Sequence, residues 1–151
     1  MSRTRSAVDA WESLLRAQHL IMTKFTADAS IWHGITVREY DVLYQLSKHD
    51  MKQTELTRRL LIPQPSLSRL IDRLVDKGWI EREVDIHDRR ITRLRLTESG
   101  EQMQRKVGKA HTLAVADVML TGLTSEECDT LKHLTDKLVQ PQCGADGNLA
   151  Q

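Results

Sequence analysis

Apolar residues in the first part of the chain recur at spacings of three and four, which is the period of an α-helix. No proline interrupts this pattern over residues 5–32, so it predicts one long helix that ends at Gly34. Its apolar members are Val8, Trp11, Leu14, Leu15, Ile21, Met22, Phe25, Ala29 and Trp32. Thr36 and Glu39 have the spacing of a capping box, so a second helix is predicted from there to about His49.

Two shorter helices are predicted next, from Gln53 to Leu60 and over residues 65–77. The turn between them carries two prolines, and Pro65 suits the first position of a helix because its missing N–H is not needed there. Gly78 ends the second helix. After it, apolar and polar residues alternate on both sides of a charged tip at 86–90, which predicts a hairpin of two short strands.

The rest of the chain returns to the helical period. Thr97 caps a helix predicted over residues 98–121, and Thr124 begins a second capping box before a last helix. The apolar stripes of these helices consist of Met103, Val107, Ala110, Ala114, Val118, Met119, Cys128, Leu131, Leu134 and Leu138. The fold is therefore predicted to be mainly α with a small β-hairpin. One domain is expected over residues 1–140, and the small and polar residues of 141–151 predict a flexible tail.

Charge is distributed unevenly along a chain whose formal net charge is +1. Residues 1–51 carry six basic and six acidic side chains, residues 52–95 carry eleven and seven, and residues 98–151 carry five and eight. The middle segment thus has a net charge of +4, which favours an anionic partner for this part of the chain. No run of apolar residues is long enough for a membrane span or a signal peptide, so a cytoplasmic location is expected.

Residues 65–77 separate into an apolar and a polar side when they are placed at 100° per residue. The buried stripe is predicted to consist of Leu67, Leu70, Ile71, Leu74 and Val75. The opposite side is slim, hydroxylated and cationic near the helix start, which suits the DNA major groove. Small side chains allow a close approach, and an arginine can bridge O6 and N7 of guanine. The candidates for contact with DNA are Gln64, Ser66, Ser68, Arg69 and Arg73.

An ordinary amphipathic helix with a solvated charged face is the competing interpretation of the same residues. Asp72 and Asp76 favour it, because these carboxylates repel phosphates unless an arginine of the helix or of the hairpin neutralises them. The preceding short helix favours DNA binding, since the pair has the helix-turn-helix arrangement. The hairpin tip also favours it: Asp88, Arg89 and Arg90 are candidates there, and an arginine can enter a narrow minor groove.

Several short motifs occur in a fixed order between residues 52 and 100. They are Gln53–Leu56, Ser68–Leu74, Lys77–Arg82, Asp88-x-Arg90 and Leu96-Thr97-x-x-Gly100. In this order and spacing they resemble the MarR family of winged helix-turn-helix transcription regulators. The resemblance implies a winged helix-turn-helix lobe at 36–97 and a helical dimerisation lobe formed by 5–32 and 98–140.

The resemblance also implies that Arg90 contacts the minor groove and that Asp88 orients it. One departure from the family is Leu61, which occupies a turn position where a glycine is common. A leucine in the left-handed conformation that such a turn requires costs on the order of 1 kcal/mol. Pro63 and Pro65 also bracket Gln64, so the turn is expected to take a different path from the usual one, which leaves open which of Gln64, Ser66 and Ser68 touches bases.

A homodimer follows from the resemblance and, independently, from the apolar stripes. The stripes at 8–32, 103–119 and 128–138 present more apolar surface than a small winged lobe can cover. Two-fold symmetry places two recognition helices about 34 Å apart, which predicts a pseudo-palindromic site. The predicted function is a nucleoid-associated, sequence-specific regulator that binds double-stranded DNA. The resemblance further implies a repressor that is relieved by a small aromatic or phenolic ligand.

Residues for such a ligand are suggested by the resemblance rather than by a motif: Trp11, Arg16, His19, Trp32, His33, Arg38 and Tyr44. A redox-responsive regulator that uses Cys128 or Cys143 is an alternative, and so is a winged-helix module for protein contacts alone. No metal site is expected, because Asp129 and His133 form a lone pair of ligands one turn apart. No cofactor is expected, and the lack of a catalytic motif predicts that the chain is not an enzyme.

Overall fold

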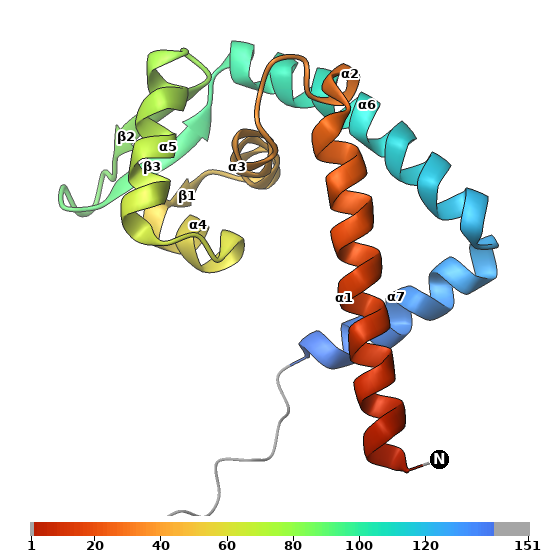
Figure 1. Cartoon of the computed structure of the whole chain (residues 1–151). Coiled ribbons are helices and arrows are strands. Elements are labelled where there is room, and N and C mark those ends of the chain that lie inside the picture. Colours follow the sequence, from red (N-terminus) through yellow and green to blue (C-terminus); the bar gives the residue numbers. More distant parts are fainter. Residues whose placement is uncertain (1, 141–151) are drawn as a thin grey trace, which may run out of the picture. The chain divides into compact units, whose positions relative to one another are not determined.

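The structure, a computed structural model, describes residues 2–140 and is mainly helical with one small sheet (Figure 1). The predicted fold class is confirmed. The chain divides into two compact units, one that ends at Ala114 and one that begins at Val115. The tail predicted to be flexible, residues 141–151, lies outside the described residues.

Seven helices and three strands make up the described chain. The helices are α1 (Arg3–Ala27), α2 (Ala29–Trp32), α3 (Val37–Lys48), α4 (Gln53–Leu60), α5 (Gln64–Asp76), α6 (Glu98–Gly122) and α7 (Ser125–Val139). The strands are β1 (Met51–Lys52), β2 (Ile80–Val84) and β3 (Thr92–Leu96), which pair antiparallel in the order β1-β3-β2. The two capping boxes, at Thr36 and Thr124, are both present as predicted.

The continuous helix predicted over 5–32 is wrong, because the chain breaks at Asp28 between α1 and α2. The backbone of Asp28 is extended, and its carboxylate accepts hydrogen bonds from the backbone N–H and the hydroxyl of Ser30 at 3.0 and 2.5 Å. An aspartate that caps a new helix start competes with continuation of the first helix. The apolar period runs through the break without a change, so periodicity alone did not reveal it.

The predicted hairpin is confirmed, but the sheet has a third strand that the sequence pattern missed. β1 pairs Met51 with Leu94 of β3, and it is too short to show an alternation of its own. α5 begins at Gln64, so Pro65 occupies the first turn but not the first position. The missing N–H of Pro65 is still among the free donors of a helix start, and the proline is accommodated there.

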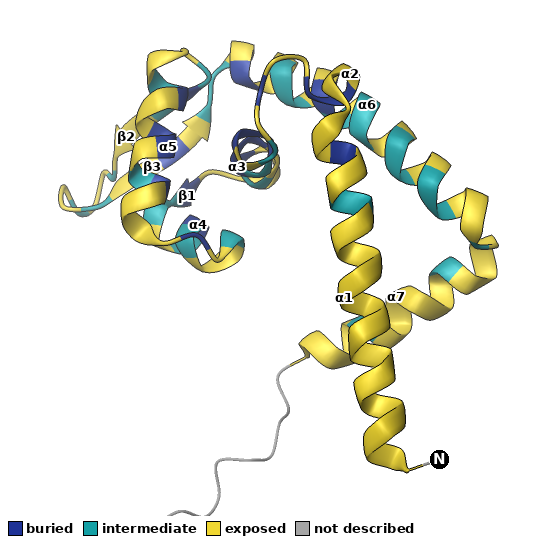
Figure 2. Ribbon diagram, viewed as in Figure 1, coloured by how far each residue is buried: buried dark blue, intermediate teal, exposed yellow. Residues whose placement is uncertain are grey.

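The core of the first unit lies between α3, α4, α5 and the sheet, and it extends to the end of α1 (Figure 2). Its fully buried side chains are Val42, Leu43, Met51, Leu56, Leu67, Ile71, Leu74, Ile80, Leu94 and Val107. Four of the five residues predicted for the stripe of α5 are buried, and Val75 is half-buried. Because this stripe is buried, α5 has one fixed orientation in the unit.

Glu39 is the one buried charged residue of the described chain, and it ties the start of α3 to the end of α5. Its carboxylate accepts a hydrogen bond from the Thr36 backbone at 2.8 Å and forms an ion pair with Lys77 at 2.7 Å. Burial by itself raises the pKa of Glu39, but the hydrogen bonds from Lys77 and Thr36 outweigh it and hold that pKa below its ordinary value. The buried charge is thus fully partnered.

The junction between the hairpin and α6 explains the Leu96-Thr97-x-x-Gly100 motif. The Thr97 hydroxyl donates to the carbonyl oxygen of Gly78 at 2.5 Å and accepts from the backbone of Gly100 at 3.1 Å. A Cβ on Gly100 would lie 2.0 Å from the carbonyl oxygen of Trp79, so only glycine fits. The motif therefore fastens the end of the sheet to the first turn of α6.

The second unit consists of the end of α6 and α7, and it has little core of its own. No residue of α7 is buried, and apolar side chains remain exposed along it and on the end of α6. They are Leu120, Leu131, Leu134, Leu138 and Val139. α1 in the first unit is similar: Phe25 is its only buried residue, and Val8, Trp11, Leu14, Leu15 and Leu20 are exposed (Figure 2).

At the turn between α4 and α5, Leu61 adopts the left-handed conformation that the usual turn requires, with φ 52° and ψ 33°. Its side chain is 89% exposed, so burial does not offset the backbone cost. We predict that Leu61→Gly is more stable than Leu61→Ala by about 1 kcal/mol, because alanine keeps the Cβ that opposes this conformation. Urea unfolding of both variants at one protein concentration checks this difference, and equal midpoints would contradict it.

Candidate nucleic-acid interface

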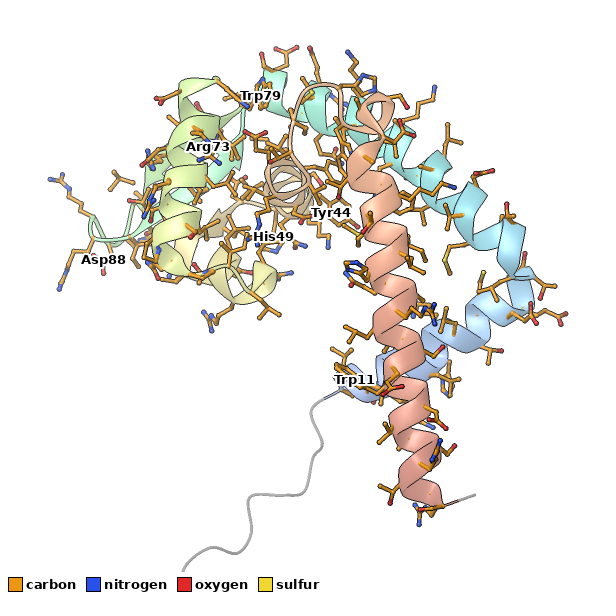
Figure 3. All side chains as sticks on the ribbon, in the orientation of Figure 1. Trp11, Tyr44, His49, Arg73, Trp79 and Asp88 are labelled. Carbon is orange, nitrogen blue, oxygen red and sulfur yellow. The ribbon has the colours of Figure 1, made fainter. Side chains whose placement is uncertain are left out.

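α5 presents one cationic face because its opposite stripe is buried. Ser66, Arg69 and Arg73 are exposed on the outer side, and Figure 3 shows Arg73 on that helix. Pro63 precedes the helix, and no side chain caps the free N–H groups of its first turn. The exposed N–H groups and the two arginines together form a surface suited to anions.

Ser68 is placed differently from the other candidates on α5. It is half-buried, and its hydroxyl accepts a hydrogen bond from the Gln53 side chain of α4 at 2.6 Å. This bond joins the first turn of α4 to the second turn of α5, the two helices of the helix-turn-helix. The sequence carried no signal for it, since the two residues lie fifteen positions apart. Gln64, in contrast, is exposed in the first turn of α5.

The hairpin tip is held by aspartates rather than by apolar contacts. Asp85 accepts hydrogen bonds from the backbone N–H groups of His87 and Asp88 at 2.8 and 3.2 Å, and it forms an ion pair with Arg93 at 3.0 Å. The hydrogen bond from the His87 backbone, then that from Arg93, lower the pKa of Asp85 to about 2. The tip therefore keeps this anchor at neutral pH.

Asp88 and Arg90 lie at the end of the hairpin, where Figure 3 labels Asp88. Asp88 accepts a hydrogen bond from the Arg90 backbone at 3.0 Å, and its carboxylate is 3.5 Å from the Arg90 guanidinium. The Arg90 side chain is nevertheless 94% exposed. The tip thus offers a guanidinium to solvent on a backbone that the two aspartates shape.

Ion pairing divides the basic residues of the segment 52–95 into two groups. Six of the eleven form ion pairs: Arg59, Lys77, Arg82, Arg90, Arg93 and Arg95. The other five form none with any residue of 2–140: Lys52, Arg58, Arg69, Arg73 and Arg89. The unpaired cations include both arginines of the α5 face and one at the hairpin tip. Arg58, at the end of α4, was not among the predicted site residues.

Asp72, whose charge favoured the competing interpretation, is neutralised from the hairpin. Its carboxylate accepts a hydrogen bond from the Arg82 guanidinium of β2. This is one of the two sources of neutralisation that the sequence left open. Asp76, one turn further along α5, forms no ion pair with the described residues.

The residues suggested for a ligand do not meet in one cleft. Trp32 is buried, and its indole N–H donates to the carbonyl oxygen of Phe25 at 2.6 Å, so it belongs to the core. Tyr44 is 43% exposed and stacks on Tyr40. Trp11, Arg16 and His33 are exposed, and none of the three lines the grooves to which Arg38 and His19 contribute (Figure 3 labels Trp11).

Two of the suggested ligand residues do line grooves of the first unit. Arg38 lines one of about 520 Å³, together with Met22, Thr26, Thr36, Val37, Asp41, Leu60, Leu61 and Ile62. His19 lines a neighbouring groove that shares Met22 and Thr26 with the first. Burial raises the pKa of Asp41, and the charges of His111 and Arg38 oppose that shift. The first groove thus combines an apolar wall with a half-buried acid and an arginine.

The described residues also include candidates for metal and thiol chemistry. Within residues 2–140 no group of three potential ligands is placed to hold a metal ion. Cys128 is a free, half-buried thiol on α7, and Cys143 lies outside the described residues. Across the part of the chain that the structure describes, no helix has both the length and the apolar content for a membrane span.

Comparison with known proteins agrees with this geometry. The sequence profile of the MarR family matches residues 33–91. The chain is 26% identical to a mutant MarR from E. coli complexed with operator DNA, over 84% of this chain and 94% of that one, with a TM-score of 0.71. It is also 26% identical to AbsC, a MarR family transcriptional regulator from Streptomyces coelicolor, over 93% of each chain, with a TM-score of 0.76.

BldR from Sulfolobus solfataricus, a transcriptional regulator, has the same fold at 18% identity. The match covers 93% of this chain and all of that one, with a TM-score of 0.79. The family profile covers the helix-turn-helix and most of the hairpin, and the structural matches extend over nearly the whole chain. The resemblance seen in the sequence motifs is therefore confirmed. Over residues 33–91 the chain thus matches the MarR family, and its fold is that of proteins described as transcriptional regulators, not enzymes.

Proposed function

We propose that the chain is a homodimeric, sequence-specific regulator that binds double-stranded DNA through α5 and the hairpin. The observation that carries this proposal is the set of exposed, unpaired cations on the elements of the winged lobe: Arg58 on α4, Arg69 and Arg73 on α5, and Arg89 beside the exposed Arg90 at the hairpin tip. Phosphate binding requires such cations, because each contact releases counterions from the duplex. The operator-bound relative supports the same partner.

The proposed roles follow from position on the two elements. Arg69 lies near the slim start of α5, where Ser66 and Gln64 are also exposed, and these side chains read base edges in the major groove. Arg73, one turn further along, binds phosphate. Arg90 enters the minor groove from the hairpin tip, with Asp88 fixing its backbone. Ser68 contributes by holding α5 against α4 through Gln53.

The dimer is proposed from the exposed apolar side chains on α1 and on the second unit. Rows of large apolar side chains left exposed along a helix mark an interface, and a second copy offers the same rows in a two-fold arrangement. The DNA site is then a pseudo-palindrome whose half-sites lie about one helical turn apart. We place the regulator in the cytoplasm, at the nucleoid.

Regulation by a small ligand is proposed from the groove that Arg38 and Asp41 line. Its apolar wall suits an aromatic or phenolic molecule, and Arg38 supplies a partner for an acidic group. The groove lies against the turn at Leu60–Ile62, directly before α5. A ligand bound in the groove therefore contacts this turn and changes the orientation of the recognition helix α5. Release of a repressor from DNA is the proposed outcome.

The first prediction concerns Arg69 as a reader of bases. Arg69→Ala is expected to cost about 1–3 kcal/mol of DNA-binding free energy and to relax specificity at one base pair in each half-site. Selection from random duplexes with the wild type and the variant measures both effects. Arg105→Ala is the matched control, since this arginine of α6 is exposed but outside the α5 face. An unchanged motif with Arg69→Ala would remove the base-reading role.

The second prediction concerns Arg90 at the hairpin tip. Arg90→Ala is expected to weaken binding about tenfold while it leaves the selected motif nearly intact, because a minor-groove arginine responds to groove width more than to base identity. Titration of the selected duplex at moderate salt measures the loss. If the variant binds as tightly as the wild type, the hairpin tip has no part in recognition.

The third prediction concerns the dimer. Leu134→Glu places a carboxylate on the exposed apolar side of α7, where Leu134 is 53% exposed. It is expected to raise the dimer dissociation constant about a hundredfold, because an unpaired charge is costly in an apolar interface. Sedimentation equilibrium measures this constant, and His133→Glu, which adds the same charge on the side of α7 away from the apolar stripe, is the control. A monomeric wild type at micromolar concentration would refute the dimer.

A further inference from the structure

The ion pair between Asp72 and Arg82 joins the recognition helix to the hairpin. Arg82 lies in the middle of β2, opposite Leu94 of β3 in the antiparallel register. Residues opposite each other share a face of the sheet, so Arg82 emerges beside the fully buried Leu94. α5 packs against β2, and the guanidinium of Arg82 donates to the Asp72 carboxylate on that helix (Figure 1).

Asp72 is an unusual residue for the surface on which it lies. It follows Arg69 by three positions and adjoins Arg73, so it belongs to the exposed face proposed to meet DNA. Its side chain is 60% exposed. A free carboxylate there would repel the phosphate backbone, and Arg82 cancels this charge. The same bond occupies a guanidinium that would otherwise be available to a phosphate.

Stability does not account for this pair. The side chain of Arg82 is 39% exposed and that of Asp72 is 60% exposed, and ion pairs as open to solvent as this one contribute little to folding. The contact between α5 and β2 already rests on buried apolar side chains, among them Ile71, Leu74 and Ile80. Either charged residue can therefore be replaced without loss of the fold.

We infer that Asp72 is a specificity-determining residue that withholds Arg82 from the phosphate backbone. The inference rests on the proposed DNA binding by α5 and the hairpin. Phosphate contacts raise affinity for every sequence, whereas base contacts raise it for one. On non-operator DNA the protein can shift its position until each available cation contacts a phosphate. An unpaired Arg82 therefore strengthens binding to non-operator DNA more than it strengthens binding to the operator. The internal pair keeps that background affinity low.

The test compares two duplexes of equal length: the one recovered by selection with the wild type, and a scrambled sequence of the same composition. Asp72→Asn is expected to raise affinity for the scrambled duplex roughly threefold to tenfold and to raise affinity for the selected duplex less. The plot of log affinity against log salt is expected to steepen by about 0.9 for each subunit, the value for one added phosphate contact.

Three further variants separate this role from a general effect of charge. Asp76→Asn removes an aspartate from the same helix without freeing a guanidinium, so its salt slope is expected to match the wild type. Arg82→Gln leaves the Asp72 carboxylate unpaired and is expected to weaken binding to both duplexes. The double variant Asp72→Asn with Arg82→Gln is expected to return the slope to the wild-type value. Thermal unfolding checks that each variant is folded.

The outcomes distinguish this inference from the proposed function. If the wild type binds duplex but Asp72→Asn changes neither the scrambled-duplex affinity nor the slope, Asp72 has no such role and the proposed function stands. A steeper slope that persists in the double variant also overturns the inference, because Arg82 is then not the released cation. If the wild type binds no duplex at low salt, the proposed function fails and the inference fails with it.

Discussion

Burial of one stripe of α5 is the constraint on which the rest of the winged lobe depends. The buried residues of this stripe are Leu67, Leu70, Ile71 and Leu74. Because this side of the helix is held in the core, the opposite side faces solvent. Arg69 and Arg73 are exposed for that reason. The cost of presenting cations near one another is small at the surface, where water screens them. The core thus determines which side chains are presented to a partner.

Much of this arrangement could be predicted from the sequence, because it depends on local chemistry. The predicted features include the capping boxes, the apolar stripe of α5 and the hairpin, and each involves residues close together in the chain. The break at Asp28 was missed because the apolar period continues through it. The strand β1 was missed because two residues are too few to show an alternation. Gly100 was noted as part of a motif, but its reason, the carbonyl oxygen of Trp79, is a tertiary contact.

The candidate site follows the same division. The outward positions of Arg69 and Arg73 could be predicted from a helical projection, whereas the pairing of Asp72 with Arg82 and of Gln53 with Ser68 required the fold. Residues 52–95 contain eleven basic residues, which the sequence alone does not distinguish. In the structure six of them form ion pairs and five form none with the described residues. Three of the seven residues suggested for a ligand are tryptophan or tyrosine, and one of these, Trp32, is buried in the core.

The salt dependence of duplex binding by the wild-type protein tests the central claim most directly. If two subunits each place three unpaired cations on phosphates, affinity falls by about a thousandfold between 50 and 200 mM salt, along a straight line in log affinity against log salt. A flat line, or the absence of duplex binding at the lowest salt, would contradict the assignment of the α5 face and the hairpin tip to DNA.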